Sequence, residues 1–332
     1  MGDLSERQQK RKNGSGKNSV TKRPGMNRKK TKKGSMTPHR THQIKRSGSK
    51  NKKRRSKRAR PIWATVSQLE QDQFMALTRS IPSDEPVVSV IIPAMNEEST
   101  IAEAVLEGRR IHPSSEVIVV ANGSTDETAV RAETAGAQVL YYHDPLGHDV
   151  GRHVGAEAAK GRVLLFIDGD MVIPAHQLRP FVRAVLSGVD IALNDYKGPI
   201  QRTPVHPVVE AKYVLNIMLG RSDLGGASLT AVPHAISRKA YEMIGSSILS
   251  SPPLAQAIGI ARGLNVQAVH PIPVGQLNPT RRKGGADLLT EVILRDHQEA
   301  VHWLTENYGP RAGYTDLHRD RQLVRSEVNE AR

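Results

Sequence analysis

Short apolar runs alternate with helical patterns between residues 87 and 167, and this alternation limits the possible folds more than any other feature of the chain. Runs rich in β-branched and aromatic residues predict four strands, at 87–92, 116–120, 139–142 and 163–167. Helical spacing marks the segments between them, at 99–111, 126–135 and 151–160. Strands and helices that alternate in this way predict an α/β fold with a mostly parallel central sheet and helices on both faces.

The pattern is weaker beyond residue 180. We expect helices at 181–186, 206–220, 240–245 and 254–263, and strands at 190–194 and 266–269. Apolar residues at helical spacing over 286–306 predict a long amphipathic helix that packs on the domain. We therefore divide the chain into a tail at 1–60, a linker with a helix at 61–86, the α/β domain at 87–285, the C-terminal helix at 286–310 and a loose charged tail at 311–332.

The first 60 residues are strongly basic. They hold 23 Lys and Arg against 2 Asp and Glu, a net charge of +21, so the rest of the chain carries −6. Without Trp, Tyr or Phe, this tail cannot bury enough apolar surface to offset the entropy lost on ordering, and we expect it to be disordered. The sequence allows three roles for this tail: a solubilising arm, a salt-dependent tether to an anionic polymer or membrane surface, or a sequence-independent contact with nucleic acid.

The chain contains no cysteine, which excludes disulfides and thiolate metal sites. No run of 18 apolar residues is present, so we expect no transmembrane segment. The first residues lack the apolar stretch of a secretory signal. These features predict a cytoplasmic protein, which the basic tail could place at the periphery of a membrane.

Polar side chains follow three of the predicted strands, at the ends where open α/β sheets bind their ligands. The clusters are Asn96-Glu97, Asn122-Gly123-Ser124 and Asp168-Gly169-Asp170. Two carboxylates spaced by one residue on extended backbone project to the same side. Because like charges so close repel, we expect Asp168 and Asp170 to hold a divalent cation, Mg²⁺ or Mn²⁺, which could clamp a diphosphate. The sequence therefore indicates chemistry on a nucleotide-activated substrate.

Three motifs in register resemble the family 2 glycosyltransferases of the GT-A fold. They are Val88-Ser-Val-Ile-Ile-Pro-Ala-Met-Asn-Glu-Glu98, Val119-Val-Ala-Asn-Gly-Ser-Thr-Asp126 and Leu165-Phe-Ile-Asp-Gly-Asp170. The resemblance implies a metal-dependent transfer of a hexosyl group from a nucleotide sugar, with a UDP-sugar favoured. It also implies that Pro93, Ala94, Glu97 and Asn122 hold the nucleoside.

Two of the matching positions depart from the family pattern or extend it. Asn122 replaces the usual acidic residue before the Gly-Ser turn, and an amide can still hydrogen-bond a base edge. The segment Gly151-Arg152-His153-Val154-Gly155 resembles a helix start of the family, which implies that Arg152 lies near the donor phosphates or the sugar. The resemblance also implies a further metal ligand from the carboxyl half, for which His234 and His270 are the candidates, with Asn278 as an alternative.

The catalytic base is the least determined part of the site. The family places an acidic pair before an apolar helix, but the matching stretch Ser250-Ser-Pro-Pro-Leu-Ala-Gln256 contains no acid. Either Asp195 or Asp223 supplies the base, or the enzyme is a retaining one that needs none. A likeness to retaining glucosyl-3-phosphoglycerate synthases favours the second option, with Leu224-Gly-Gly-Ala-Ser-Leu-Thr230 as a loop for an anionic acceptor. A non-catalytic protein that binds a nucleotide sugar is the competing class.

Overall fold

The computed structural model describes residues 85–201, 203–277 and 288–317, with only the backbone of residue 288. The basic tail, the helix expected at 61–86, Asn278 and most of the charged C-terminal tail lie outside the described residues. Within the described ranges no helix combines the length and the apolar character that a membrane crossing needs.

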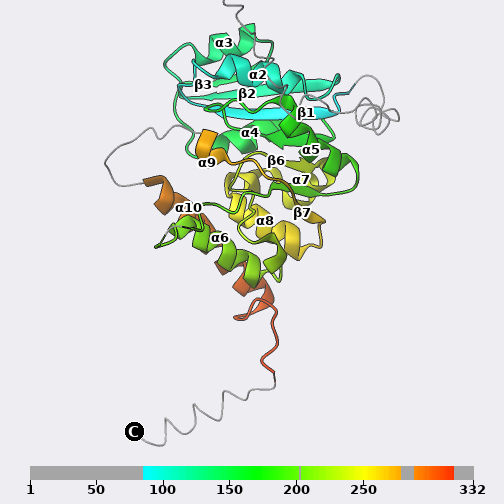
Figure 1. Cartoon of the computed structure of the whole chain (residues 1–332), viewed down its shortest axis with the longest axis vertical. Helices are drawn as coiled ribbons and strands as arrows, with labels where there is room; N and C mark the ends of the chain where they lie inside the picture. Colours follow the sequence, from blue (N-terminus) through cyan, green and yellow to red (C-terminus); the bar gives the residue numbers. More distant parts are fainter. Residues whose placement is uncertain (1–84, 202, 278–287, 318–332) are drawn as a thin grey trace, which may run out of the picture. The chain divides into compact units, whose positions relative to one another are not determined.

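Seven strands form one sheet in the order β3-β2-β1-β4-β6-β5-β7 (Figure 1). The strands are β1 (Val88–Ala94), β2 (Ser115–Asn122), β3 (Gln138–Tyr142), β4 (Val163–Phe166), β5 (Ile191–Asn194), β6 (His234–Ser237) and β7 (Val266–His270). All pairings are parallel except those of β6, which runs antiparallel to both β4 and β5. The predicted α/β fold with a mostly parallel sheet is therefore confirmed.

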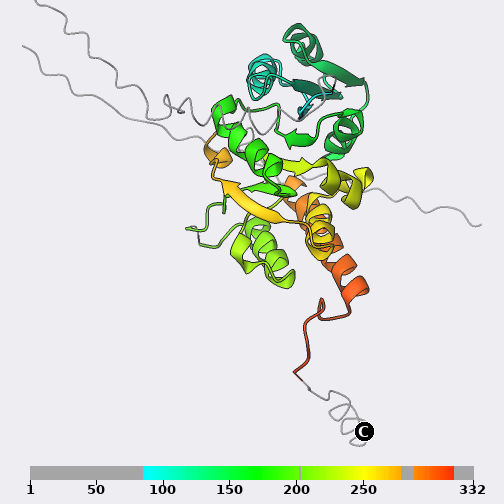
Figure 2. The same cartoon turned by 90° about the vertical axis from the view of Figure 1, so that its right-hand side faces the viewer.

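Helices cover both faces of this sheet (Figure 2). They are α2 (Ile101–Arg109), α3 (Thr128–Thr134), α4 (Val150–Ala158), α5 (Ala175–Leu186), α6 (Pro207–Met218), α7 (Arg238–Ile244), α8 (Pro252–Ala261), α9 (Val274–Leu277) and α10 (Leu288–Tyr308), with short 3₁₀ turns at η2 (Ser222–Leu224) and η3 (Ser246–Ser250). Helices α2, α3 and α5 contribute to one apolar core, and α4, α7 and α8 contribute to the other.

The alternation of side chains along β1 shows why both faces need cover. Val88, Val90 and Ile92 point into the α2/α5 core, whereas Ile91 points into the α4/α8 core. All of its residues except the half-buried Pro93 are buried, which explains why its sequence is mostly apolar rather than alternating. A third, smaller cluster packs α10 against α6 and α8 through Ala300 and its neighbours, so the predicted amphipathic helix does cover the domain (Figure 1).

Two sequence expectations about strands need correction. The first strand was predicted to end at residue 92, before Pro93, but β1 continues to Ala94, since the Pro93 carbonyl still accepts a hydrogen bond from the Gly169 N–H at 3.2 Å. Strand β6 was not expected at all. Its four residues lie directly between Pro233 and a helix that starts at Arg238, so they show no period of their own and form a strand only because β4 and β5 flank them.

The direction of β6 decides what meets at the ligand edge of the sheet. Because β4 and β5 are both antiparallel to β6, they are parallel to each other, and the carboxyl ends of β1, β2, β4, β5 and β7 lie at one edge. The first residue of β6, His234, pairs with Phe166 at the end of β4 and therefore lies at the same edge.

The contact between α4 and β1 can be tested at Gly155. A Cβ atom there would lie 2.5 Å from Ile91 Cγ2 and 3.2 Å from Val120 Cγ2, both in the core. We expect Gly155→Ala to lower the free energy of unfolding by about 1–3 kcal/mol in a urea titration, although alanine favours helices. Glu157→Ala, on the exposed side of the same helix, should change it by less than about 0.5 kcal/mol. A more stable Gly155→Ala variant would contradict the packing described here.

Candidate active site

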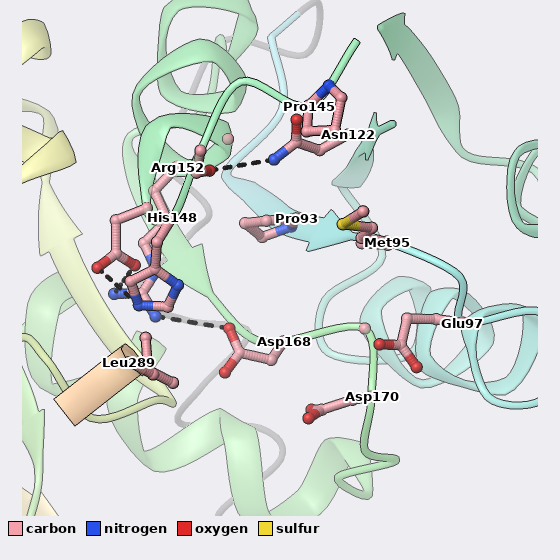
Figure 3. Close-up of a pocket in the computed structure, with 15 residues that line it drawn as sticks. Pro93, Met95, Glu97, Asn122, Pro145, His148, Arg152, Asp168, Asp170 and Leu289 are labelled. Carbon is pink, nitrogen blue, oxygen red and sulfur yellow. Dashed lines mark hydrogen bonds and ion pairs between the residues drawn. The ribbon is translucent and has the colours of Figure 1, made fainter. Parts of the chain in front are cut away.

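A pocket of about 480 Å³ opens at the carboxyl edge of the sheet (Figure 3). It is lined by residues from the ends of β1, β2 and β4, from the loop before α4 and the first turn of α4, and from α10: Pro93, Ala94, Met95, Glu97, Asn122, Pro145, Gly147, His148, Asp149, Gly151, Arg152, Asp168, Gly169, Asp170 and Leu289. Figure 3 shows Asp168, Asp170 and Glu97 on one side of the pocket, with Asn122 and Pro145 on the other. The three polar clusters expected to converge do converge here.

The backbone of the carboxylate pair is tied to two other elements. The Gly169 N–H donates to the Pro93 carbonyl, and the Thr100 hydroxyl just before α2 donates to the Gly169 carbonyl at 2.6 Å. A side chain at Gly169 would place its Cβ 2.9 Å from Ala94 Cβ, so only glycine lets the turn lie this close to β1. The backbone of Gly169 is therefore fixed, and it holds Asp168 and Asp170 on either side of it.

Arg152 is the buried cation of the site, with 6% of its side chain exposed. Its guanidinium lies 3.0 Å from the Asp149 carboxylate, 3.5 Å from the Asp168 carboxylate and 3.4 Å from the Leu229 carbonyl. Burial alone would lower the pKa of Arg152, but the charges of Asp149 and Asp168 outweigh it and raise that pKa. Asp168 keeps 35% of its side chain exposed to the pocket, so the ion pair leaves part of its carboxylate open.

Asp149 is a site residue that the sequence did not indicate. It precedes α4 with a left-handed φ of 61°, and its carboxylate is 4% exposed. One oxygen pairs with Arg152, and the other lies 3.2 Å from His148 Nε2. The only local signal is that Asp tolerates the left-handed region better than most residues. Asp149 brings the negative charge that keeps Arg152 in place beside Asp168.

The loops that follow β1 and β2 hold each other. The Asn96 N–H donates to the Ser124 hydroxyl, and the Asn96 side chain accepts from the Thr125 N–H at 2.9 Å. The Glu97 N–H donates to the Thr128 hydroxyl at 2.7 Å. These bonds fix Glu97, which lines the pocket and is 6% exposed. Glu97 and the neighbouring Pro93 and Ala94 thus occupy the wall where the resemblance places the nucleoside.

Asn122 also lines the pocket, but its amide group has partners within the chain. Its Oδ1 accepts from the Leu146 N–H at 2.6 Å, and its Nδ2 donates to the Gly147 carbonyl at 3.2 Å. The side chain was expected to contact a base edge, but both of its polar groups form hydrogen bonds with the loop of residues 145–147. Asn122 shapes the pocket wall that contains Pro145, and the amide suits this task because it offers a donor and an acceptor together.

His234 lies beside the pocket and does not line it. Its ring stacks on Phe166 with centroids 5.0 Å apart, and its Nδ1 lies 3.1 Å from the Ala231 carbonyl. Burial, together with the charge of Arg152, lowers the pKa of His234 to about 3. The ring is therefore neutral, and it shares with Arg152 a small second cavity of about 10 Å³.

Asp195 and His270 lie at the carboxyl edge of the sheet, but not on the strands whose ends line the pocket. They follow or end β5 and β7, and neither lines the pocket. With strands about 4.8 Å apart, β5 is roughly 10 Å and β7 roughly 14 Å from β4. Asp223, the other candidate base, is engaged by Arg221 in a two-bond ion pair at the surface. The structure therefore does not bring these three side chains to the carboxylate pair.

The carboxylates of the site suit a metal ion whose coordination shell is completed by a bound substrate. Across residues 85–201, 203–277 and 288–317, no three His, Cys, Asp or Glu side chains come together so that they could hold a metal by themselves. Mg²⁺ sites commonly use one or two carboxylates, with substrate phosphates and waters as the other ligands. Asp168 and Asp170 supply such a carboxylate pair at the wall of the pocket.

Helix α10 adds one further wall, which the sequence placed on the domain but not at the site. Leu289 lines the pocket, and Asp296 lies seven residues, or two helical turns, further along. Burial, then the negative charges of Asp149 and Glu299, raise the pKa of Asp296 to about 6. The C-terminal helix therefore contributes an apolar contact to the pocket and a carboxyl group that interacts with Asp149.

A mostly parallel sheet with a carboxylate pair after its fourth strand defines the class of this protein: it has a GT-A type α/β fold. A crystal structure of glucosyl-3-phosphoglycerate synthase from Mycobacterium tuberculosis, in complex with Mn²⁺, uridine diphosphate and phosphoglyceric acid, is similar with a TM-score of 0.53. The match covers 74% of this chain and 84% of that chain at 20% sequence identity, so it shows a shared fold.

Sequence comparison finds the same family that the motifs resemble. Residues 89–212 match Glycosyl transferase family 2. Glucosyl-3-phosphoglycerate synthase of Mycobacterium tuberculosis (strain CDC 1551 / Oshkosh) is 32% identical over 135 residues, which are 36% of this chain and 40% of that protein. The synthase of Mycolicibacterium smegmatis is 32% identical over 131 residues, 34% and 42% of the two chains. The chain thus spans less than half the length of these curated relatives.

The charge balance around Asp149 can be tested at Asp296. Since folding raises the pKa of this carboxyl from its ordinary value, the folded state loses stability as the pH rises from about 4 to about 6. Asp296→Asn should raise the free energy of unfolding by about 1 kcal/mol above pH 6, after allowance for solvent screening, and the gain should shrink towards pH 4.

The measurement is a set of urea titrations between about pH 4.5 and about pH 7.5. Glu306→Gln is a matched control on the same helix, because Glu306 pairs only with the exposed His302 among the interactions that the structure describes for it. A gain for Asp296→Asn that is equal at both ends of the pH range would contradict the raised pKa.

Proposed function

We propose that this protein is a metal-dependent glycosyltransferase that moves a hexosyl group from a UDP-sugar to an acceptor. The observation that carries the proposal is the pair Asp168 and Asp170 at the wall of the pocket, with the buried cation Arg152 beside it. The family 2 match of residues 89–212 supports transferase chemistry. The complex of the structural neighbour with Mn²⁺ and uridine diphosphate supports the metal and the nucleotide.

Different residues of the pocket hold the two halves of the donor. Pro93, Ala94 and Glu97 at the end of β1, with the wall that Asn122 builds, enclose a nucleoside. Asp168 and Asp170 hold Mg²⁺ or Mn²⁺ against the diphosphate. When bound, the ion supplies Lewis-acid stabilisation of the charge that develops on the leaving diphosphate. Arg152 places a second, permanent positive charge at the same end of the pocket.

The acceptor side lies at residues 194–198 and 224–234 in our proposal. The loop Leu224–Thr230 carries no acidic side chain, which suits an anionic acceptor such as the phosphoglyceric acid bound by the structural neighbour. Asp195 does not line the pocket, so we assign no proton transfer to it. In a retaining reaction the departing phosphate can accept the acceptor proton, and no carboxylate base is needed.

The basic tail supports a second element of the proposal. Its net charge of +21 over residues 1–60 fits a tether to an anionic polymer or to a membrane surface. Such a tether would leave the pocket chemistry unchanged and would weaken as the salt concentration rises.

Donor binding should depend on the metal. In a thermal-shift panel of UDP-sugars, we expect at least one to raise the melting temperature with Mn²⁺ and to lose most of this effect with EDTA, because a ligand that binds only the folded state stabilises it. UDP released over time, measured by a coupled assay, separates an enzyme from a non-catalytic binding protein. Stabilisation without any release of UDP would favour the binding protein.

Asp170→Ala should abolish this release. We expect a loss of about 100-fold or more, since metal stabilisation of a leaving group is worth several kcal/mol, while the melting temperature without ligand stays close to that of the wild type. Asp223→Ala, which removes an exposed carboxylate paired with Arg221, is the matched control and should retain wild-type release. Full activity of Asp170→Ala would reject the metal site.

A further inference from the structure

Two buried amides lie behind the loop of residues 225–229. Asn216 on α6 and Gln256 on α8 are each 1% exposed, and Gln256 Nε2 donates to Asn216 Oδ1 at 2.7 Å. They sit on different helices, 40 residues apart in sequence. Neither residue lines the pocket, although Gln256 ends the stretch 250–256 that the sequence analysis matched to the acidic pair of the family. A side-chain pair so deeply buried is costly unless every polar group has a partner.

The remaining polar atoms of both amides go to the loop. Asn216 Nδ2 donates to the Gly225 carbonyl at 2.8 Å and to the Ala227 carbonyl at 3.0 Å. Gln256 Oε1 accepts from the Leu229 N–H at 2.8 Å. The loop is itself buried from Gly226 to Leu229, so these groups cannot turn to water for a substitute. The two amides therefore fix the course of the loop backbone.

The same loop contacts the active-site arginine. The Leu229 carbonyl accepts from Arg152 Nη1 at 3.4 Å, while Arg152 Nη2 lies 3.5 Å from Asp168. A chain of contacts thus runs from Asn216 through Gln256 and the two polar groups of Leu229 to the arginine of the carboxylate pair. On its other side the loop is confined, because a Cβ at Gly226 would lie 2.7 Å from the Tyr213 ring and 2.9 Å from the Lys197 carbonyl.

We propose that Asn216 and Gln256 are positioning residues of the transfer site, which hold the loop of residues 225–229 against Arg152 and so fix the acceptor side relative to the metal-binding carboxylates. The expected effect on turnover rests on the proposed function, but the effect on the loop can be tested by itself. Donor binding should be spared, because Asp149 holds Arg152 independently at 3.0 Å and the loop itself does not line the pocket.

The test compares Gln256→Met with the wild-type full chain. Methionine keeps the length and the apolar packing of the side chain but removes both hydrogen bonds. Hydrogen exchange of a peptide that covers residues 225–231 should accelerate by about tenfold or more. Release of UDP from UDP-glucose with Mn²⁺ should fall by about tenfold or more, because small displacements at a reacting centre cost rate steeply. The Kd for UDP with Mn²⁺ should stay within about twofold.

Two further variants exclude a general loss of structure. Asn216→Ala removes the bonds to Gly225 and Ala227 from the other helix and should reproduce the faster exchange. The double variant should exchange and turn over much like the more affected single variant, since both residues act on one loop. Ile258→Val, in the apolar cluster of α8 two residues beyond Gln256, weakens packing without touching the loop and should leave loop exchange and turnover unchanged.

Unchanged loop exchange in Gln256→Met would overturn the inference, as would a turnover loss in Ile258→Val equal to that in Gln256→Met, or additive effects in the double variant. If the wild-type chain itself neither bound UDP with Mn²⁺ nor released UDP, the proposed function would fail instead. The exchange data would still decide whether the amide pair holds the loop.

Discussion

The ion pair of Arg152 with Asp149 and Asp168 is the interaction on which the rest of the site depends. A guanidinium this deeply buried needs anionic partners, because the free energy lost on removing its charge from water exceeds what one long ion pair restores. Asp149 is the nearer anionic partner of Arg152, at 3.0 Å. The Asp168 side chain stays more than a third exposed and faces the pocket. The arginine thereby orients one carboxylate of the pair without neutralising the pair as a whole, and a divalent ion can still be accommodated.

The remaining elements bring three layers of support to that ion pair. The sheet supplies strand ends at one edge, and the tight turn at Gly169 fixes the carboxylates against β1. Helix α10 adds Leu289 to the pocket wall from the far end of the chain. The loop that Asn216 and Gln256 hold reaches Arg152 from the other side. Each support comes from a different stretch of sequence, so we expect a single substitution to alter one part of the site and spare the others.

The sequence predicted what depends on local pattern. Strands β1 to β4 and their helices follow from apolar runs and helical spacing, and the clusters at Glu97, Asn122 and Asp168 follow from the rule that parallel sheets bind ligands at their carboxyl edge. It could not predict β6, whose four residues become a strand only through their neighbours. Nor could it show that Asn122 binds the 145–147 loop, because its partners lie more than twenty residues away. His234 and His270 were chosen by type, but strand order and burial keep them out of the pocket.

The central claim is that Asp168 and Asp170 hold a metal against a diphosphate while Arg152 stays on Asp149. Anomalous diffraction from crystals of the full chain soaked with UDP and Mn²⁺ measures this directly. The account predicts a manganese peak bounded by both carboxylates and the diphosphate oxygens, with the Arg152–Asp149 contact intact. Bound UDP with no manganese at the pair, or with both carboxylates turned onto Arg152, would contradict it.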